Sequence, residues 1–150
     1  MKYIKTFEKL RVGNQKELNS ALLKYSRVKE SLQLIRSLIF KGADVNCKNS
    51  IGSTPLLIAS QAHFYSAIKL LIEKGADVYA IDKYGNNALI LLVSSNKFIN
   101  STKECIDLLI EKDIDLAQTN YQDKDAFLLQ TKAVEYMNYY YTKDVVVSRT

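Results

Sequence analysis

The residue types that most often carry out chemistry are scarce in this chain. It contains one histidine, His63, and two cysteines, Cys47 and Cys105. A Ser-His-Asp or Cys-His arrangement would have to use His63, which lies far in sequence from both cysteines. A zinc site needs several Cys or His ligands at short spacing, and the sequence does not offer them. We therefore expect no metal and no cofactor, and interpret both cysteines as reduced thiols that are buried or half-buried.

Paired carboxylates are the next candidates for chemistry. Asp113 is followed by Asp115, and Asp123 by Asp125. Two acids can perform general acid–base catalysis when a pocket separates their pKa values. Both pairs fall in predicted turns, where Asp is favoured because its side chain binds backbone amides. The five glycines are scattered and form no phosphate-binding loop. These observations predict that the protein is not an enzyme.

Positive charge is concentrated in the N-terminal third. The net charge is +5, and the 11 Lys and Arg residues of positions 1–48 outnumber the 4 Asp and Glu residues there. Such a region could bind phosphates, so an electrostatic nucleic-acid or anionic-surface binder is one hypothesis. No helix-turn-helix or RNA-binding signature accompanies the basic residues, which fall on several predicted helix faces. A solvated surface or a face for an acidic protein is the favoured interpretation.

An internal repeat explains where these residues must lie. The segment Leu71-Ile72-Glu73-Lys74-Gly75-Ala76-Asp77-Val78 repeats the pattern of residues 38–45, 33 positions earlier. Residues 51–58 and 84–91 repeat each other at the same offset. A third copy spans residues 109–116, where Asp113 matches Gly75 at an offset of 38, and we place the five extra residues in a loop near 96–102.

A period of 33 residues with Gly-Ala-Asp-Val and Gly-x-Thr-Pro-Leu elements resembles the ankyrin repeat. The resemblance covers roughly residues 15–130. It implies an all-α solenoid of stacked helix-turn-helix pairs, with short β-turn fingers and helical caps. We expect one domain with an N-terminal cap at 1–14, repeats at about 15–48, 49–81 and 82–119, and an atypical repeat or cap at 120–150.

Local signals agree with this register. Thr54 is a good N-cap, and Pro55 then occupies the first helical position, where its missing N–H costs nothing. Gly75 follows the second helix of that repeat and can close it in a left-handed conformation. The segment from Asp77 to Gly85 is predicted to form a projecting finger. Inner and outer helices of the first repeat are expected near Glu17–Tyr25 and Lys29–Phe40.

The chain also departs from the ankyrin pattern. Leu57, Ile90 and Leu128 stand where the repeat usually carries histidine. The third repeat has Asn87-Ala88 in place of Thr-Pro and Asp113 in place of glycine, so we expect it to be looser than the second. His63 falls between two helices of the second repeat and is interpreted as an exposed turn residue.

The resemblance implies a concave face, formed by finger tips and inner helices, that receives partners. Ile51, Tyr84 and Tyr121 interest us most, because each puts an apolar or aromatic group in a turn. A finger residue can also simply pack on its neighbour. The candidate partner-binding residues are Lys48, Ser50, Ile51, Ser53, Gln61, Ile81, Lys83, Tyr84, Asn86, Ser94, Ser95, Thr119, Tyr121, Gln122 and Lys124.

The favoured function is therefore that of a protein-binding module, acting as an adaptor, an inhibitor, a toxin-neutralising immunity-type protein or an effector. We expect a chain that is monomeric alone and has another protein as its partner. No apolar run approaches the roughly 18 residues of a membrane span. Without a secretory signal the expected location is the cytoplasm, or a host cell if the protein is an effector.

Overall fold

The computed structural model describes residues 13–94, 100–114 and 120, and the side chains of residues 100 and 101 are not among those described. Nearly all of the cap predicted at 1–14, residues 95–99, and nearly all of the unit predicted at 120–150 lie outside this range. The division of the chain into a cap, three repeats and a terminal unit stays a prediction.

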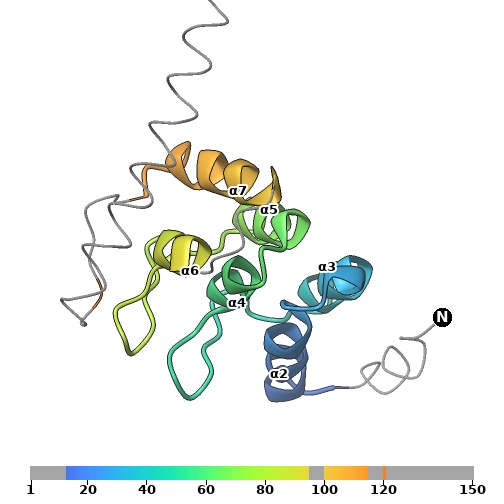
Figure 1. Ribbon diagram of the computed structural model, residues 1–150. Coiled ribbons are helices and arrows are strands. Elements are labelled where there is room, and N and C mark those ends of the chain that lie inside the picture. Colours follow the sequence, from blue (N-terminus) through green and yellow to red (C-terminus); the bar gives the residue numbers. More distant parts are fainter. Residues whose placement is uncertain (1–12, 95–99, 115–119, 121–150) are drawn as a thin grey trace, which may run out of the picture.

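The described segments are helical, as the all-α prediction requires. In chain order the elements are α2 (Gln15–Tyr25), a short 3-10 helix η2 (Lys29–Ser31), α3 (Leu32–Phe40), α4 (Pro55–Gln61), α5 (Tyr65–Glu73), α6 (Ala88–Ser94) and α7 (Asn100–Ile110). They form three antiparallel pairs, α2 with α3, α4 with α5, and α6 with α7, and each pair packs on the next (Figure 1). The predicted solenoid of stacked helix pairs is confirmed.

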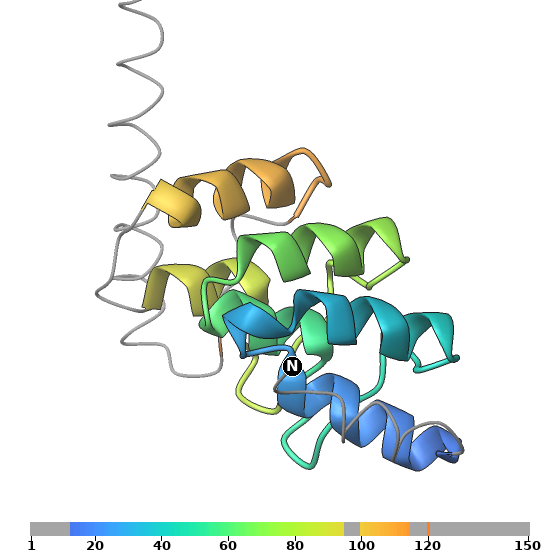
Figure 2. The ribbon, with the colours of Figure 1, turned by 90° about the vertical axis from the view of Figure 1, so that its right-hand side faces the viewer.

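The outer helices α3, α5 and α7 lie one above another when the molecule is turned by 90° about the vertical axis (Figure 2). The inner helices α2, α4 and α6 line the other side. Two connecting loops project away from the inner helices, one before α4 and one before α6 (Figure 1). We call residues 44–53 the first finger and residues 77–86 the second finger.

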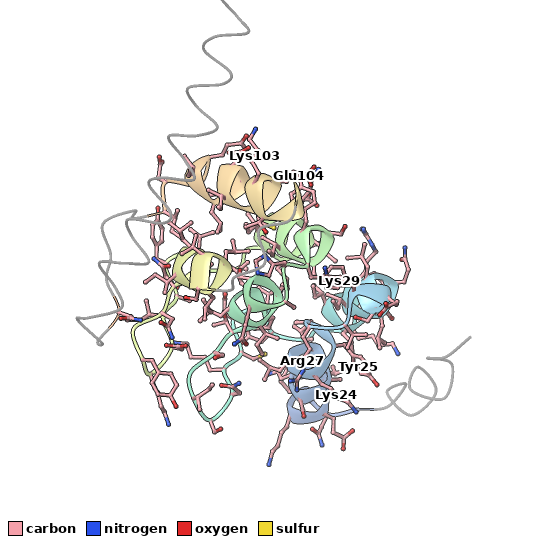
Figure 3. The ribbon with its side chains drawn as sticks, in the orientation of Figure 1. Lys24, Tyr25, Arg27, Lys29, Lys103 and Glu104 are labelled. Atoms are coloured by element: carbon pink, nitrogen blue, oxygen red, sulfur yellow. The ribbon has the colours of Figure 1, made fainter. Side chains whose placement is uncertain are left out.

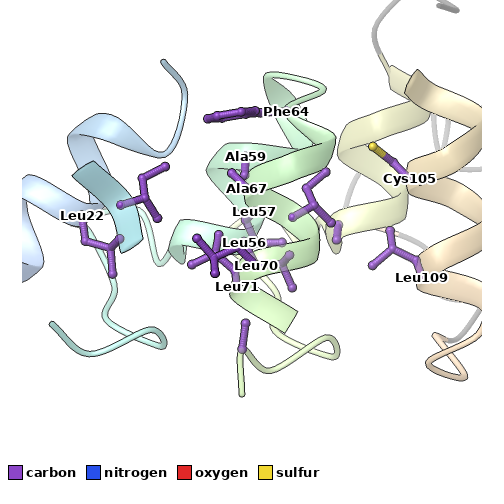
Figure 4. Close-up of a cluster of buried hydrophobic side chains, with 14 of the residues drawn as sticks. Leu22, Leu56, Leu57, Ala59, Phe64, Ala67, Leu70, Leu71, Cys105 and Leu109 are labelled. Carbon is purple, nitrogen blue, oxygen red and sulfur yellow. The ribbon is translucent and has the colours of Figure 1, made fainter. Parts of the chain in front are cut away.

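Equivalent apolar residues of successive repeats form continuous buried columns. Ile35, Ile68 and Ile106 occupy one column, and each is at most 1% exposed. Leu38, Leu71 and Leu109 occupy another column, and each of them is also at most 1% exposed. Leu22, Leu56, Leu71 and Leu109 are among the side chains seen in the core close-up (Figure 4). Each helix pair buries an apolar face against the neighbouring pair. The stability of a repeat therefore comes largely from its contacts with its neighbours.

The predicted helix signals are found in place. Thr54 Oγ1 accepts a hydrogen bond from the backbone N–H of Leu57 at 3.3 Å, and Pro55 is the first residue of α4. In the third repeat Asn87 is the equivalent N-cap, because its Oδ1 accepts a hydrogen bond from the backbone N–H of Ile90 at 2.8 Å. The change from Thr-Pro to Asn-Ala therefore preserves the cap, and α6 has 7 residues, as α4 does.

Helices α5 and α7 end in the same backbone conformation, although glycine follows α5 and aspartate follows α7. Gly75 has φ +88°, and the next residue, Ala76, donates its N–H to the carbonyl of Leu71 at 2.9 Å. Asp113 replaces this glycine and adopts φ +56°, and Ile114 donates to Leu109 at 3.3 Å. Helix α7 therefore ends with the same backbone bond as α5, but Asp113 adopts a left-handed conformation that is unfavourable for a residue with a Cβ.

Two sequence expectations need correction. Residues 100–102, which we expected in a loop, are instead the first residues of α7, and α7 has 11 residues, whereas α5 has 9. His63 does lie between α4 and α5, but it is not exposed: it is 6% accessible, and its Nδ1 lies 2.9 Å from Thr102 Oγ1 of α7. The neighbouring repeat covers it, which the sequence of one repeat cannot reveal.

The left-handed residue at the end of α7 allows a direct test. We expect Asp113→Gly to raise the free energy of unfolding by about 0.5–1 kcal/mol, because glycine adopts positive φ without a Cβ penalty. Urea denaturation monitored by circular dichroism measures the change. Lys112→Gly, one position earlier at negative φ, is the matched control and should lower stability instead. Equal effects of the two substitutions would contradict this explanation.

Candidate protein-binding surface

The two fingers share one hydrogen-bonding scheme built on a single polar side chain. In the first finger, Asn49 Oδ1 accepts from the N–H groups of Ile51 at 3.1 Å and Ser53 at 2.9 Å. In the second, Asp82 Oδ1 accepts from Tyr84 at 2.8 Å and Asn86 at 3.0 Å. Since fingers have no core of their own, these bonds define the shape of each tip.

Backbone hydrogen bonds complete the tips and join them. Asn49 donates its N–H to Ser53 at 3.1 Å, and Asp82 donates to Asn86 at the same distance. The N–H of Lys83 then donates to the carbonyl of Ile51 at 2.9 Å, which links the second finger to the first. Gly52 adopts φ +78° beside this bond, a left-handed conformation that glycine takes without the penalty of a Cβ. The two tips therefore form one continuous, ordered edge.

The bases of the fingers are joined to neighbouring repeats by side chains. Asn46 donates its Nδ2 to the carbonyl of Gly75 at 3.1 Å and accepts at Oδ1 from the N–H of Asp77 at 2.8 Å. At the next junction, Tyr79 donates its hydroxyl to the carbonyl of Lys112 at 3.4 Å. These contacts fix the spacing from one finger to the next.

In the first repeat, helix α2 replaces this finger contact. Gln15 Nε2 donates to the carbonyl of Gly42 at 2.8 Å, and Asn19 Oδ1 accepts from the N–H of Asp44 at 2.8 Å. Two residues of a helix thus make the same pair of bonds that Asn46 makes one repeat later. They can do so because α2 has 11 residues, against 7 in α4 and in α6.

A groove of about 650 Å³ lies between α2 and the base of the first finger. Its α2 side carries Lys16, Asn19 and Leu23, and its finger side carries Cys47 and Lys48. Of these residues, Lys48 alone belongs to the predicted partner-binding set. The register of the repeat gave no hint that α2 is longer and reaches the finger; the extra polar residues before Leu18 were the available signal.

The other candidate residues are placed as follows. Exposed on the described surface are Ile51 at 40% and Tyr84 at 52%, together with Lys48, Ser50, Lys83, Gln61 and Ser94. Ile81 and Asn86 are half-buried. Ser53 is 7% exposed and cannot serve as the contact we expected, because so little of it is accessible to a partner. Ser95, Thr119, Tyr121, Gln122 and Lys124 lie outside the described residues.

The structure brings only part of this set together. Ser50, Ile51, Lys83 and Tyr84 share the linked finger tips. Gln61 ends α4 and Ser94 ends α6, whereas the fingers precede the starts of these helices. A helix of 7 residues is roughly 10 Å long, so these two residues lie a helix length away from the tips.

Both cysteines fill positions that other repeats give to small apolar residues. Cys105 is 0% exposed and stands in the column of Ala67, and Cys47 is 8% exposed and stands in the column of Ala80. Both are free, as predicted. Burial, with help from nearby Asp44, raises the pKa of Cys47 to about 11, and burial with Glu104 raises the pKa of Cys105 to about 12. Both thiols are therefore protonated at neutral pH and poor nucleophiles.

Among residues 13–94 and 100–114, no three metal-ligating side chains lie close enough together to hold an ion. None of the described helices is long and apolar enough to cross a lipid bilayer. What the described surface offers is a row of ordered loops beside stacked helix pairs, which defines a repeat protein of the solenoid class.

The family within this class is established by comparison. A family model of ankyrin repeats in three copies matches residues 22–122, more than half of the sequence. The chain belongs to the ankyrin-repeat family. Ankyrin repeats generally mediate protein–protein interaction, and the family is typically non-enzymatic. Among curated proteins, none matches this chain.

The finger scheme predicts a strong effect at its buried acceptor. Asp82→Ala removes the acceptor of two backbone amides at a site that is 7% exposed, so the free energy of unfolding should fall by about 2 kcal/mol. Asp82→Asn is the matched control, because Asn49 makes the same bonds in the first finger; its loss should be less than half as large. Urea unfolding of both variants decides, and equal losses would contradict the scheme.

The raised thiol pKa values predict slow reaction and alkaline sensitivity. At pH 8 a thiol reagent should modify both cysteines slowly in the folded protein and fully after unfolding. The folded state keeps protons that the unfolded state releases from about pH 9, so the free energy of unfolding should fall as the pH rises toward 11 and 12. In the Cys47→Ala/Cys105→Ala variant the free energy of unfolding should fall less over this pH range, because the two thiols no longer contribute. Rapid modification of the folded protein at pH 8 would contradict the burial.

Proposed function

We propose that this protein is a binding module whose contact surface is the linked pair of finger tips. The observation that carries the proposal is the exposure of Ile51 and Tyr84 on an edge whose backbone is fixed by Asn49, Asp82 and the bond between Lys83 and Ile51. Exposed apolar groups in a rigid setting lose little entropy on binding, which favours affinity.

The proposal extends to the kind of role. Adaptor, inhibitor, neutralising partner and effector all require a surface that occupies another protein, and none requires a reactive group on this chain. The described cysteines support this interpretation, because both serve the core. We further propose a protein that is monomeric alone and acts in a cytoplasm, its own or a host's.

A second candidate function rests on a separate group of residues. Lys24, Arg27 and Lys29 are exposed and gather around the connection between α2 and α3 (Figure 3). The ammonium of Lys24 lies 5.4 Å from the centre of the Tyr25 ring. This group would suit an electrostatic binder of nucleic acid or of an anionic surface. We rank it second, because its cations lack the ordered apolar anchors that the finger tips provide.

The finger-tip proposal is tested with the partner recovered from the native host by pull-down and identified by mass spectrometry. Ile51→Ala and Tyr84→Ala should each weaken binding by about 1–3 kcal/mol if they are hot spots. Isothermal titration calorimetry with the purified partner measures the loss.

Phe40→Ala is the matched control, because Phe40 is 92% exposed at the end of α3, on the outer layer of helices. It should leave the affinity unchanged. If the Ile51→Ala/Tyr84→Ala variant is folded and binds the partner as well as the unmodified protein does, the finger tips are not the contact surface.

A further inference from the structure

The groove between α2 and the first finger has the chemistry of a receptor for acidic groups. We propose that it binds an extended acidic segment of the protein partner, with Lys16 and Lys48 as its charge contacts. This inference rests on the proposed function, because the segment would continue from the groove onto the finger tips.

Charge supports this occupant. Lys16 on α2 and Lys48 on the finger line opposite walls, and both are exposed. Within the described part of the chain neither ammonium group pairs with a carboxylate, since the ion pair found there joins Lys103 to Asp107 at 3.6 Å. Asp44 also lines the groove, but its Oδ1 already accepts from the N–H of Asn46 at 2.8 Å. The groove lining thus carries two lysines, Lys16 and Lys48, and one carboxylate, Asp44, which already accepts a backbone hydrogen bond.

The shape and the remaining lining favour a peptide. At about 650 Å³ the groove is large enough for several side chains, and it is open to solvent. Ser20 and Asn49 offer hydrogen-bonding groups, and Leu23 adds an apolar side chain to the lining. A mixed lining of this kind suits a backbone with carboxylate side chains better than a small apolar ligand.

The groove is also continuous with the finger-tip edge. Lys48 belongs to the groove, and three residues later Ile51 belongs to the tip. Asn49 lines the groove with the same side chain that fixes the tip through its bonds to Ile51 and Ser53. A partner segment in the groove would therefore lie beside an anchor on the tip, so that one chain could engage both.

The first test uses a fluorescein-labelled oligoglutamate of about ten residues as the probe, with fluorescence anisotropy as the readout at roughly 20 mM NaCl, where screening is weak. The unmodified protein should bind, and Lys16→Glu/Lys48→Glu should lower the affinity by at least about tenfold. Arg36→Glu/Lys74→Glu makes the same change in net charge at exposed positions outside the groove and should lower it by less than about threefold.

Each contrary result has a definite meaning. Equal losses in the two variants would assign binding to overall charge and overturn the proposal, as would a probe that does not bind at all. An oligothymidylate of similar length that binds more tightly than oligoglutamate, and depends on Lys16 and Lys48, would overturn it in favour of nucleic acid. Circular dichroism and melting curves verify that both variants are folded.

The partner itself separates this inference from the proposed function. If Lys16→Glu/Lys48→Glu keeps full affinity for the captured partner while Ile51→Ala/Tyr84→Ala loses it, the acidic-segment inference fails and the finger-tip function stands. If both variants keep full affinity, both fail. Loss in both, together with an affinity that falls as salt rises in the unmodified protein, supports both.

Discussion

The structure depends on a constraint that acts between repeats: no helix pair can bury its own apolar face. Ile35, Ile68 and Ile106 are buried because each lies in the column of the others. A shared column requires a constant distance from repeat to repeat, and the bonds from Asn46 to Gly75 and Asp77 hold that distance at the finger bases. Local stability in such an array is set by each neighbour pair rather than by one central core.

The same constraint explains why the fingers look as they do. Stacking uses the apolar faces of the helices and leaves the connecting loops without a core, so their shape has to come from polar bonds. Asn49 and Asp82 supply these bonds at equivalent positions, although one side chain is an amide and the other a carboxyl group. The tips are then free to carry side chains that the fold does not need, such as Ile51 and Tyr84. Variation at the tips can change the partner while the scaffold persists.

The cysteine and histidine side chains of the described residues contribute to packing between repeats. Cys105 occupies the column of Ala67, and the packed helices around it keep its thiol protonated. His63 adopts φ +51° in the turn before α5 and lies against Thr102 of the next repeat. Both residues therefore contribute to how repeats meet, and the described surface around the fingers relies on shape and charge instead.

The sequence by itself determined the repeat, the helix that starts at Thr54 and Pro55, the closure at Gly75 and the position of each finger, because caps and turns depend on residues within a few positions. Tertiary structure decided the burial of Ser53 and His63, the left-handed Asp113 and the groove built by Lys16 and Lys48. Burial and concave surfaces depend on what the neighbouring repeat places opposite a residue. Here, a longer α2 occupies the place of a finger, and its sign in the sequence was the run of extra polar residues before Leu18, which does not show what they contact.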